Sequence, residues 1–426
     1  MKAHQTLALA ALATGVFVAA TLAADAPAKL PSGFSITHMD LSVDPKVDFA
    51  KFAAGGWYKN FQMPEDKSRF GAFDTLEQNN WANLKAILED VSSKTHQAGS
   101  VEQKVGDFFA TAMNTDAIDA AGLKPSEADL AKIDAVKNLN DLARVAGELR
   151  GSGVSAFFGN FVFADQKQSD LNALYISQGG MSLPSRDYYF TEAFANVRDE
   201  FKKHVAKMFS LAGHNEAASR SAADTVLALE TAMAENAKTP VELRDRLANY
   251  HRYSLAELTQ LMGNFPVMTL LREAGVKDGA SDYAIVGQPK FMEALNTLLV
   301  ERSIEEWKTY LRYRLLAAAA PALARPFEEE HFRFYSTVIR GTPQMEPRWQ
   351  RAARATDSAL GEALGQLYVA KHFPPEAKAR MDEMIKNIKA VMRDRLATLE
   401  WMSPATREKA LAKFDRFVAR IGYPDK

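Results

Sequence analysis

The chain has 426 residues, of which 47% are apolar and 25% charged, a globular composition large enough for two to three domains. Its 52 basic and 53 acidic side chains give a net charge of -1, so no long-range field would attract nucleic acid or anionic lipid, and neither is an expected partner. Cysteine is absent, which excludes disulfides, thiolate metal sites and a cysteine nucleophile.

The first 24 residues have the pattern of a secretory signal peptide. Lys2 provides a short positive region, residues 7–22 form an apolar, alanine-rich stretch, and small residues follow up to position 26. An uncleaved anchor helix is the alternative, but the stretch is short for a bilayer span and no charged stop-transfer segment flanks it. We therefore expect a secreted or periplasmic protein with no membrane contact beyond this signal, and a linker over residues 25–40.

Helical periodicity dominates the following segment. Apolar residues at three- and four-residue spacing predict a helix that begins at Asp74 or Thr75 and a second helix over residues 101–113. Ser126, with Asp129 three residues later, predicts a variant capping box at the start of a third helix.

Residues 154–178 break the helical pattern. An aromatic and β-branched run is separated by polar residues 165–170 from a second apolar run, which predicts a β-hairpin with a loop of six or more residues. Residues 283–286 are predicted as another short strand. Gly151-Ser152-Gly153 lies after a helix and before a strand, the reverse of a dinucleotide-binding turn, so we interpret it as a helix C-cap.

Long helices are predicted for most of the remaining chain. Their predicted ranges are 191–212, 215–237, 254–263, 288–300, 303–320, 345–368, 375–400 and 403–420. No repeat of fixed period is present, which disfavours a solenoid. The predicted fold class is mainly α with a small β-hairpin element.

A zinc peptidase site of the H-E-x-x-H type is absent from the sequence. That motif places two histidines on one helical face, with a glutamate between them as general base. The residues that follow the eight histidines are Gln5, Met39, Gln97, Val205, Asn215, Arg252, Phe332 and Phe373. Because none is glutamate, no catalytic or metal-binding residue is assigned.

Other metal sites are not supported either. Glu328 and His331 have the spacing of a di-iron helix, but a second Glu-x-x-His is missing, and a solvated acidic face is the preferred interpretation. His204 and His214 lie too far apart to share a metal from one helix and are interpreted as ordinary surface or core residues.

A series of short motifs resembles the N-terminal region of the neprilysin family of zinc endopeptidases. It opens with Asp44-Pro45, Gly55-Gly56-Trp57 and the run from Pro64 to Asp74. Further motifs in the expected order are Leu183-Pro184-Ser185-Arg186-Asp187-Tyr188-Tyr189, Phe334-Tyr335, Pro347-Arg348-Trp349, Gly365-Gln366-Leu367-Tyr368, Trp401-Met402 and Ile421-Gly422-Tyr423-Pro424-Asp425. The resemblance covers residues 41–426, which we expect to form one neprilysin-like peptidase N-terminal domain.

The resemblance implies a two-lobed peptidase of which this chain supplies the helical, substrate-enclosing lobe. In the family, the zinc ligands and the general base come from a later part of the sequence. We therefore expect the catalytic lobe to be largely missing and the chain to be truncated before it. No cofactor is expected in this chain, whereas the intact family member binds zinc.

Two substrate-side residues follow from the resemblance. The family arginine that binds the C-terminal side of the substrate falls on Arg69, and Asp74 lines the same subsite. An arginine fork suits a peptide carboxylate. A second family arginine falls on Glu77, and this reversed charge weakens the case for carboxylate binding. The alternative is that Arg69 and Asp74 form a structural ion pair beside a helix start.

One function is therefore expected, and one alternative stays open. The first is the N-terminal portion of a secreted neprilysin-like zinc metalloendopeptidase, inactive by itself, whose partners are peptides and a separate or missing catalytic half. The alternative is a stand-alone periplasmic peptide-binding or scaffolding protein derived from a peptidase.

Overall fold

The computed structural model describes residues 35–277 and 279–424, which divide into two compact units at residues 63 and 64. The predicted signal peptide, 1–24, and most of the predicted linker lie outside the described residues. The domain boundaries predicted from sequence therefore stay predictions. Within the described ranges, no helix is both long and apolar enough to cross a lipid bilayer.

The first unit contains the 3₁₀-helix η1 (Ile36–His38) and α1 (Phe49–Asn60). The amide of Asp40 donates to the carbonyl of Phe52 at 2.8 Å, and the Asp40 carboxylate accepts from the Lys59 ammonium at 2.7 Å. These two contacts fix the segment before α1 against the helix.

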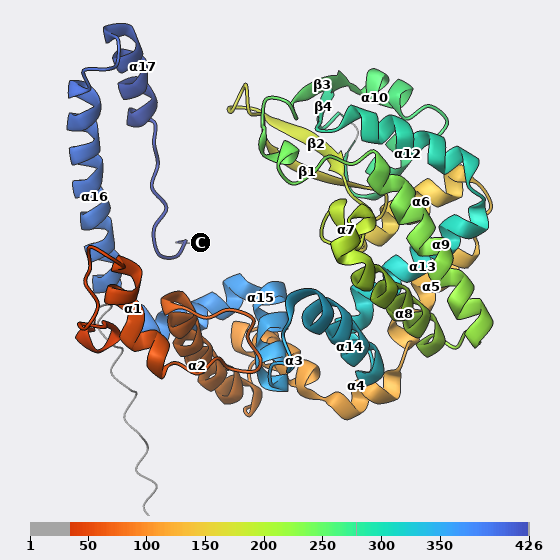
Figure 1. The fold of residues 1–426 in the computed structure, drawn as a ribbon, viewed down its shortest axis with the longest axis horizontal. Helices are drawn as coiled ribbons and strands as arrows, with labels where there is room; N and C mark the ends of the chain where they lie inside the picture. The colour runs from red at the N-terminus through yellow and green to blue at the C-terminus, as the bar shows by residue number, and fades with distance from the viewer. Residues whose placement is uncertain (1–34, 278, 425–426) are drawn as a thin grey trace, which may run out of the picture. The chain divides into compact units, whose positions relative to one another are not determined.

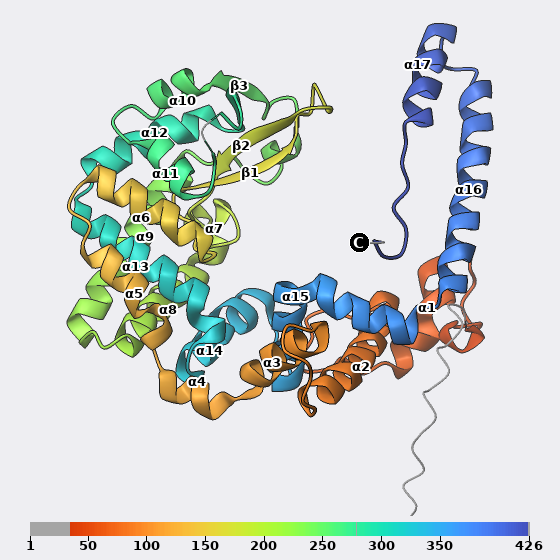
Figure 2. The ribbon, with the colours of Figure 1, turned by 180° about the vertical axis from the view of Figure 1, so that it is seen from behind.

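The second unit begins with a layer of three helices, of which two are consecutive and the third lies far away in the sequence. Figures 1 and 2 show α15 (Arg348–His372) beside α2 (Ala72–Ser92) and α3 (Val101–Met113). Their shared core consists of Trp81, Ile87, Leu88, Val91, Val105, Phe109, Ala352, Ala353 and Leu364. The predicted helix over residues 101–113 is confirmed.

Two predicted helix starts differ from the structure. The N-cap of α2 is Gly71, and Asp74 lies in the first turn, where its carboxylate accepts the Gly71 amide at 2.8 Å. At α5 (Glu127–Asp134), the Ser126 side chain makes no capping hydrogen bond. The predicted capping box is wrong because a preceding 3₁₀ turn leaves Ser126 in a helical backbone conformation, whereas an N-cap needs an extended one.

The predicted β-hairpin is confirmed and belongs to a four-stranded sheet (Figure 1). Strand β1 (Phe158–Ala164) pairs antiparallel with β2 (Asn172–Gln178), and the predicted strand β4 (Tyr283–Val286) pairs parallel with β2. A fourth strand, β3 (His251–Ser254), pairs antiparallel with β4 and was not predicted. The order β1-β2-β4-β3 leaves β1 and β3 at the two edges.

Helices surround this sheet and share its hydrophobic core. Figure 2 shows α11 next to α6, with which it packs closely. The helices are α6 (Leu139–Gly151), α9 (Glu216–Glu235), α10 (Leu255–Leu261), α11 (Val267–Glu273), α12 (Pro289–Glu301) and α13 (Ile304–Ala319). The turn after α6 is a helix C-cap, as predicted, because the amide of Val154 donates to the carbonyl of Leu149 at 3.0 Å.

A second cluster forms around α8 (Ala195–Leu211), which begins later than the predicted helix over 191–212. The short helices before it are α7 (Asp187–Phe190) and a 3₁₀ turn. Against α8 pack α14 (Arg325–Phe332) and the π-helix η6 (Arg333–Val338). The short helix α4 (Thr115–Ala121) also contacts α14.

The C-terminal part of the described chain is a pair of helices. α17 (Pro404–Asp415) folds back along α16 (Pro375–Thr398), and Arg393 pairs with Asp415 at 3.2 Å (Figure 1). The apolar side chains of α16 remain exposed, and no residue of this helix is buried. The exposed set is Met381, Met384, Ile388, Val391 and Met392.

Candidate functional site

The two predicted substrate-side residues lie at the entrance to α2. Arg69 is exposed and Asp74 is half-buried. The Asp74 carboxylate is oriented by the Gly71 amide, and no ion pair joins it to Arg69 in the described part of the chain. The structure therefore places both residues at one helix start but does not support a structural ion pair between them.

The segment before Arg69 is fixed to the start of α15. The amide of Gln344 donates to the carbonyl of Glu65 at 3.1 Å, and the Lys67 ammonium donates to the Glu346 carboxylate at 2.5 Å. Burial acts to raise the pKa of Glu346, but hydrogen bonds from Lys67 and Arg354 outweigh it and lower that pKa. Glu346 is therefore ionised at neutral pH, and it holds the segment in place.

Glu77, where the family resemblance suggests an arginine, has a structural role in this chain. Its carboxylate accepts from Trp81 Nε1 at 2.9 Å and from Arg354 Nη2 at 2.9 Å, and these hydrogen bonds lower its pKa. The Arg354 guanidinium also lies over the Trp81 ring, 4.6 Å from its centroid. The Glu77 charge is thus compensated by Arg354 of α15.

A second charged cluster links α14 to α15. Glu328 accepts hydrogen bonds from Arg351 and, at 3.2 Å, from Arg348, while Glu330 accepts from His204 at 2.8 Å. Interpreting Glu328–Glu330 as a solvated acidic face is therefore wrong for two of these residues, because arginines and a histidine from other elements cover them. Only Glu329 is exposed.

Sequence reasoning missed the arginines that organise this region. Arg348, Arg351 and Arg354 recur every three residues and so share one side of α15, which is a detectable local signal. Two cavities of about 530 and 630 Å³ adjoin Arg348 and Arg351. No catalytic groups converge in these two cavities, because both arginines already donate hydrogen bonds to Glu328.

The motif from Leu183 to Tyr189 is held by a buried carboxyl group on α9. Glu230 accepts from the Tyr189 hydroxyl at 2.7 Å and from the Ser182 hydroxyl at 2.6 Å. Arg314 donates to the same Ser182 hydroxyl at 2.8 Å. This network makes the motif a structural element of the core.

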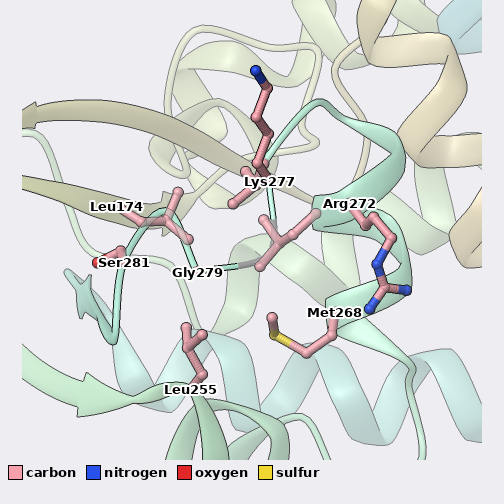
Figure 3. A pocket seen from close by; sticks show the side chains of 9 residues that line it. Leu174, Leu255, Met268, Arg272, Lys277, Gly279 and Ser281 are labelled. Atoms are coloured by element: carbon pink, nitrogen blue, oxygen red, sulfur yellow. The ribbon is translucent and has the colours of Figure 1, made fainter.

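A small pocket beside the sheet has no comparable chemistry. Figure 3 shows its apolar side chains Leu174, Leu255 and Met268, with the ammonium group of Lys277 pointing away from them. Its volume is about 40 Å³, which holds little more than a water molecule. A peptide side chain does not fit there.

The described residues provide no donor set for a catalytic metal. No group of three or more His, Asp or Glu side chains with suitable spacing occurs among residues 35–277 and 279–424. The buried His204 donates to Glu330, and Glu328 is bound by two arginines. These residues therefore do not fit a zinc site.

Comparison with known proteins identifies what this arrangement is similar to. The model of peptidase family M13 matches residues 45–424. Human endothelin-converting enzyme 1 is 29% identical over 403 residues, which are 92% of this chain and 52% of that protein. Mouse membrane metallo-endopeptidase-like 1 is 27% identical over 416 residues, 92% of this chain and 54% of that protein.

A solved structure is similar in fold as well as sequence. The Mycobacterium tuberculosis zinc metalloprotease Zmp1, in complex with an inhibitor, superimposes with a TM-score of 0.86 at 31% identity. The match covers 93% of this chain and 60% of that one. The chain thus spans about half the length of the curated relatives it matches.

Proposed function

This chain belongs to peptidase family M13, the neprilysin family, and from that premise we propose that it forms the substrate-enclosing helical lobe of a secreted zinc metalloendopeptidase. We propose further that the 426-residue chain does not hydrolyse peptides by itself.

One observation carries the proposal: the family match runs over residues 45–424, yet H-E-x-x-H occurs nowhere in the sequence. Hydrolysis by a zinc peptidase needs the metal-bound water and a general base. We propose that a segment beyond the matched region supplies both, as a separate or further part of the protein. The helical lobe would bind and enclose the peptide.

Arg69 is the proposed anchor for the C-terminal side of the peptide. It is exposed, and its guanidinium can donate two parallel hydrogen bonds to a carboxylate. Asp74 would line the same subsite, oriented by the Gly71 amide. Glu77 is excluded from this role, because its carboxylate pairs with Arg354 and Trp81.

The exposed apolar side chains of α16 indicate a surface that another protein part covers. Met384, Ile388 and Val391 are 45–57% exposed, and they recur at three- and four-residue spacing. We propose that the catalytic part of the peptidase covers this stripe. The signal-like segment at residues 1–24 supports export, so the complete enzyme would act in the periplasm or outside the cell.

A chimera tests this proposal. Residues 35–424 would replace the matched region of the mycobacterial zinc metalloprotease, and we propose that the remaining part of that protein supplies the metal site. We expect chelator-sensitive hydrolysis of a quenched fluorescent peptide. In the same chimera, Arg69→Met should raise KM roughly tenfold with little change in kcat, because a lost charge-assisted hydrogen bond weakens ground-state and transition-state binding alike.

Arg220→Met provides the matched control, since Arg220 is an exposed helix arginine whose ion-pair partner among the described residues is Glu216, at 3.0 Å. It should leave KM within about twofold of the unmodified chimera. A chimera that folds and binds zinc but cleaves nothing would contradict the proposed function. Equal KM values for Arg69→Met and Arg220→Met would remove Arg69 from the substrate site.

A further inference from the structure

The outer edge of the sheet is unpaired along β1. Along an antiparallel strand, residues whose main-chain N–H and C=O groups face the partner strand alternate with residues whose groups face away from it. The Asp165 amide donates to the Leu171 carbonyl at 2.8 Å. This hydrogen bond extends the β1–β2 ladder and identifies which residues of β1 face β2. Counting back by twos from Asp165, the main-chain groups of residues 163, 161 and 159 face β2. Those of the intervening Asn160, Val162 and Ala164 therefore point away from β2. No strand of the described chain lies on that side.

This edge lacks the features that normally prevent strand addition. Natural edge strands carry lysine, proline or bulges, or are covered by other elements. Residues 159–164 contain no charge and no proline. Phe161, Val162 and Phe163 are 51%, 62% and 65% exposed, so apolar side chains stand open on both faces of the strand. Phe161 is held flat against Tyr175, with ring centroids 5.1 Å apart, which keeps the strand extended.

The guanidinium group of Arg150 lies at the N-terminal end of the same edge. Arg150 Nη2 donates to the carbonyl of Phe158, the first outward-facing group of β1, and to that of Ala156 at 2.9 Å. No carboxylate of the described residues pairs with Arg150, although burial lowers its pKa to about 10, so it remains charged at neutral pH. An unneutralised, half-buried guanidinium favours an anionic ligand.

The surroundings of Arg150 form a polar cavity of about 310 Å³, lined also by Ser155 and Asn160. One wall is preformed, because Arg314 donates to the Ser155 carbonyl at 2.8 and 3.0 Å. The cavity and the free edge meet at Asn160, which lines the first and belongs to the second. The Arg150 guanidinium and the free main-chain groups of β1 therefore adjoin one another at Asn160.

The geometry points to β1 as a docking strand for an extended peptide, which adds antiparallel to its outer edge and places its terminal carboxylate beside Arg150. The antiparallel direction follows from position, since Arg150 lies at the N-terminal end of β1 and would meet the C-terminal end of the ligand. Asn160 and Val162 each offer one N–H and one C=O, and Ala164 offers its N–H, because its carbonyl already accepts from the Tyr175 hydroxyl at 3.1 Å. Alternate ligand side chains would contact the exposed apolar residues. This inference rests on the proposed function in taking peptides as the ligands.

Fluorescence anisotropy with the full chain tests this docking strand. The probe is an eight-residue peptide of alternating Thr and Val, labelled at its N-terminus and carrying a free C-terminal carboxylate. We expect saturable binding, and roughly tenfold weaker binding of the C-terminal amide, because the charge-assisted contact with Arg150 is lost. A peptide N-methylated at alternate residues should bind at least tenfold more weakly than the unmodified peptide.

Val162→Pro provides the protein-side test. Its missing N–H points away from β2, so the hairpin should persist, whereas the outer edge loses a donor. We expect at least tenfold weaker peptide binding, with Val162→Thr within about twofold of the unmodified chain. If Val162→Pro unfolds the hairpin, the N-methylated peptide still decides the question.

Three outcomes would overturn the inference: equal affinity for acid, amide and N-methylated peptides, no binding by the folded chain, or dimerisation of the chain that Val162→Pro abolishes. The last would assign the edge to a second copy. Failure here is distinguishable from failure of the proposed function, because binding is measured on the chain without any catalytic part. A hydrolytically active chimera with an edge that binds nothing would refute only the docking strand.

Discussion

Replacing Glu230 with alanine is expected to lower the free energy of unfolding by about 3–5 kcal/mol. The Glu230 side chain is fully buried and accepts from Tyr189, from the Ser182 hydroxyl and, at 2.9 Å, from the Ser182 amide. Its removal leaves these donors without an acceptor and opens a cavity between α9 and the segment at 182–189. Urea unfolding followed by circular dichroism measures the loss.

Glu235→Ala is the matched control, because Glu235 lies on the same helix but is exposed. It should change the free energy of unfolding by no more than about 0.5 kcal/mol. Equal effects of the two substitutions would show that the buried network contributes nothing to stability.

Glu230 also makes stability depend on pH in a defined direction. Burial raises the pKa of this carboxyl above its ordinary value of 4.5, so the folded state binds the proton more tightly than the unfolded chain. Its contribution is therefore complete below pH 4.5 and is lost as the pH rises through the folded-state pKa. Glu230→Gln removes this titration, so the variant should gain stability relative to the unmodified chain between pH 4.5 and 7.5. A difference that is constant over that interval would contradict the assignment.

Gly180→Ala is expected to cost about 3 kcal/mol or more, the second large effect. Gly180 has φ +77°, and a Cβ there would lie 2.7–2.8 Å from the backbone N, Cα and O of Phe157. Neither Gly180 nor Phe157 can easily move to relieve this clash. Phe157 is stacked on Tyr310 within the core, and the Tyr310 hydroxyl donates to the Gly180 carbonyl at 2.6 Å.

Gly213→Ala separates the clash from the backbone strain. Gly213 has φ +92°, and nothing lies within 4 Å of the position of its Cβ, so only the left-handed conformation opposes alanine. Its cost should be about 1–2 kcal/mol. Comparable losses for Gly180→Ala and Gly213→Ala in urea unfolding would mean that Phe157 moves freely, contrary to the packing described.

Local patterns in the sequence were sufficient for most helices and for the hairpin. The hairpin strands are mainly apolar runs of seven residues each, and the polar residues between them mark the turn locally. Strand β3 was missed because it has four residues and runs directly into the N-cap of α10 at Ser254. The parallel pairing of β2 with β4 joins Leu174 to Ala284, a separation that no local periodicity reports.

The candidate site was only partly predictable for the same reason. The resemblance located Arg69 and Asp74, but the partner of Glu77 lies 277 residues away at Arg354. Similarly, Asp74 reads as a helix cap by residue type, whereas the backbone places it in the first turn with Gly71 as the cap. Charge pairs between distant helices need tertiary structure. Periodicity cannot supply them.

We propose that this chain is a peptidase lobe without a catalytic centre. The most direct measurement is hydrolysis of a quenched fluorescent peptide by the purified chain, with added zinc and with a chelator, together with the zinc content of the protein. We predict neither bound zinc nor chelator-sensitive cleavage. One zinc per chain with cleavage that the chelator abolishes would contradict the claim and would require a ligand set that lacks H-E-x-x-H.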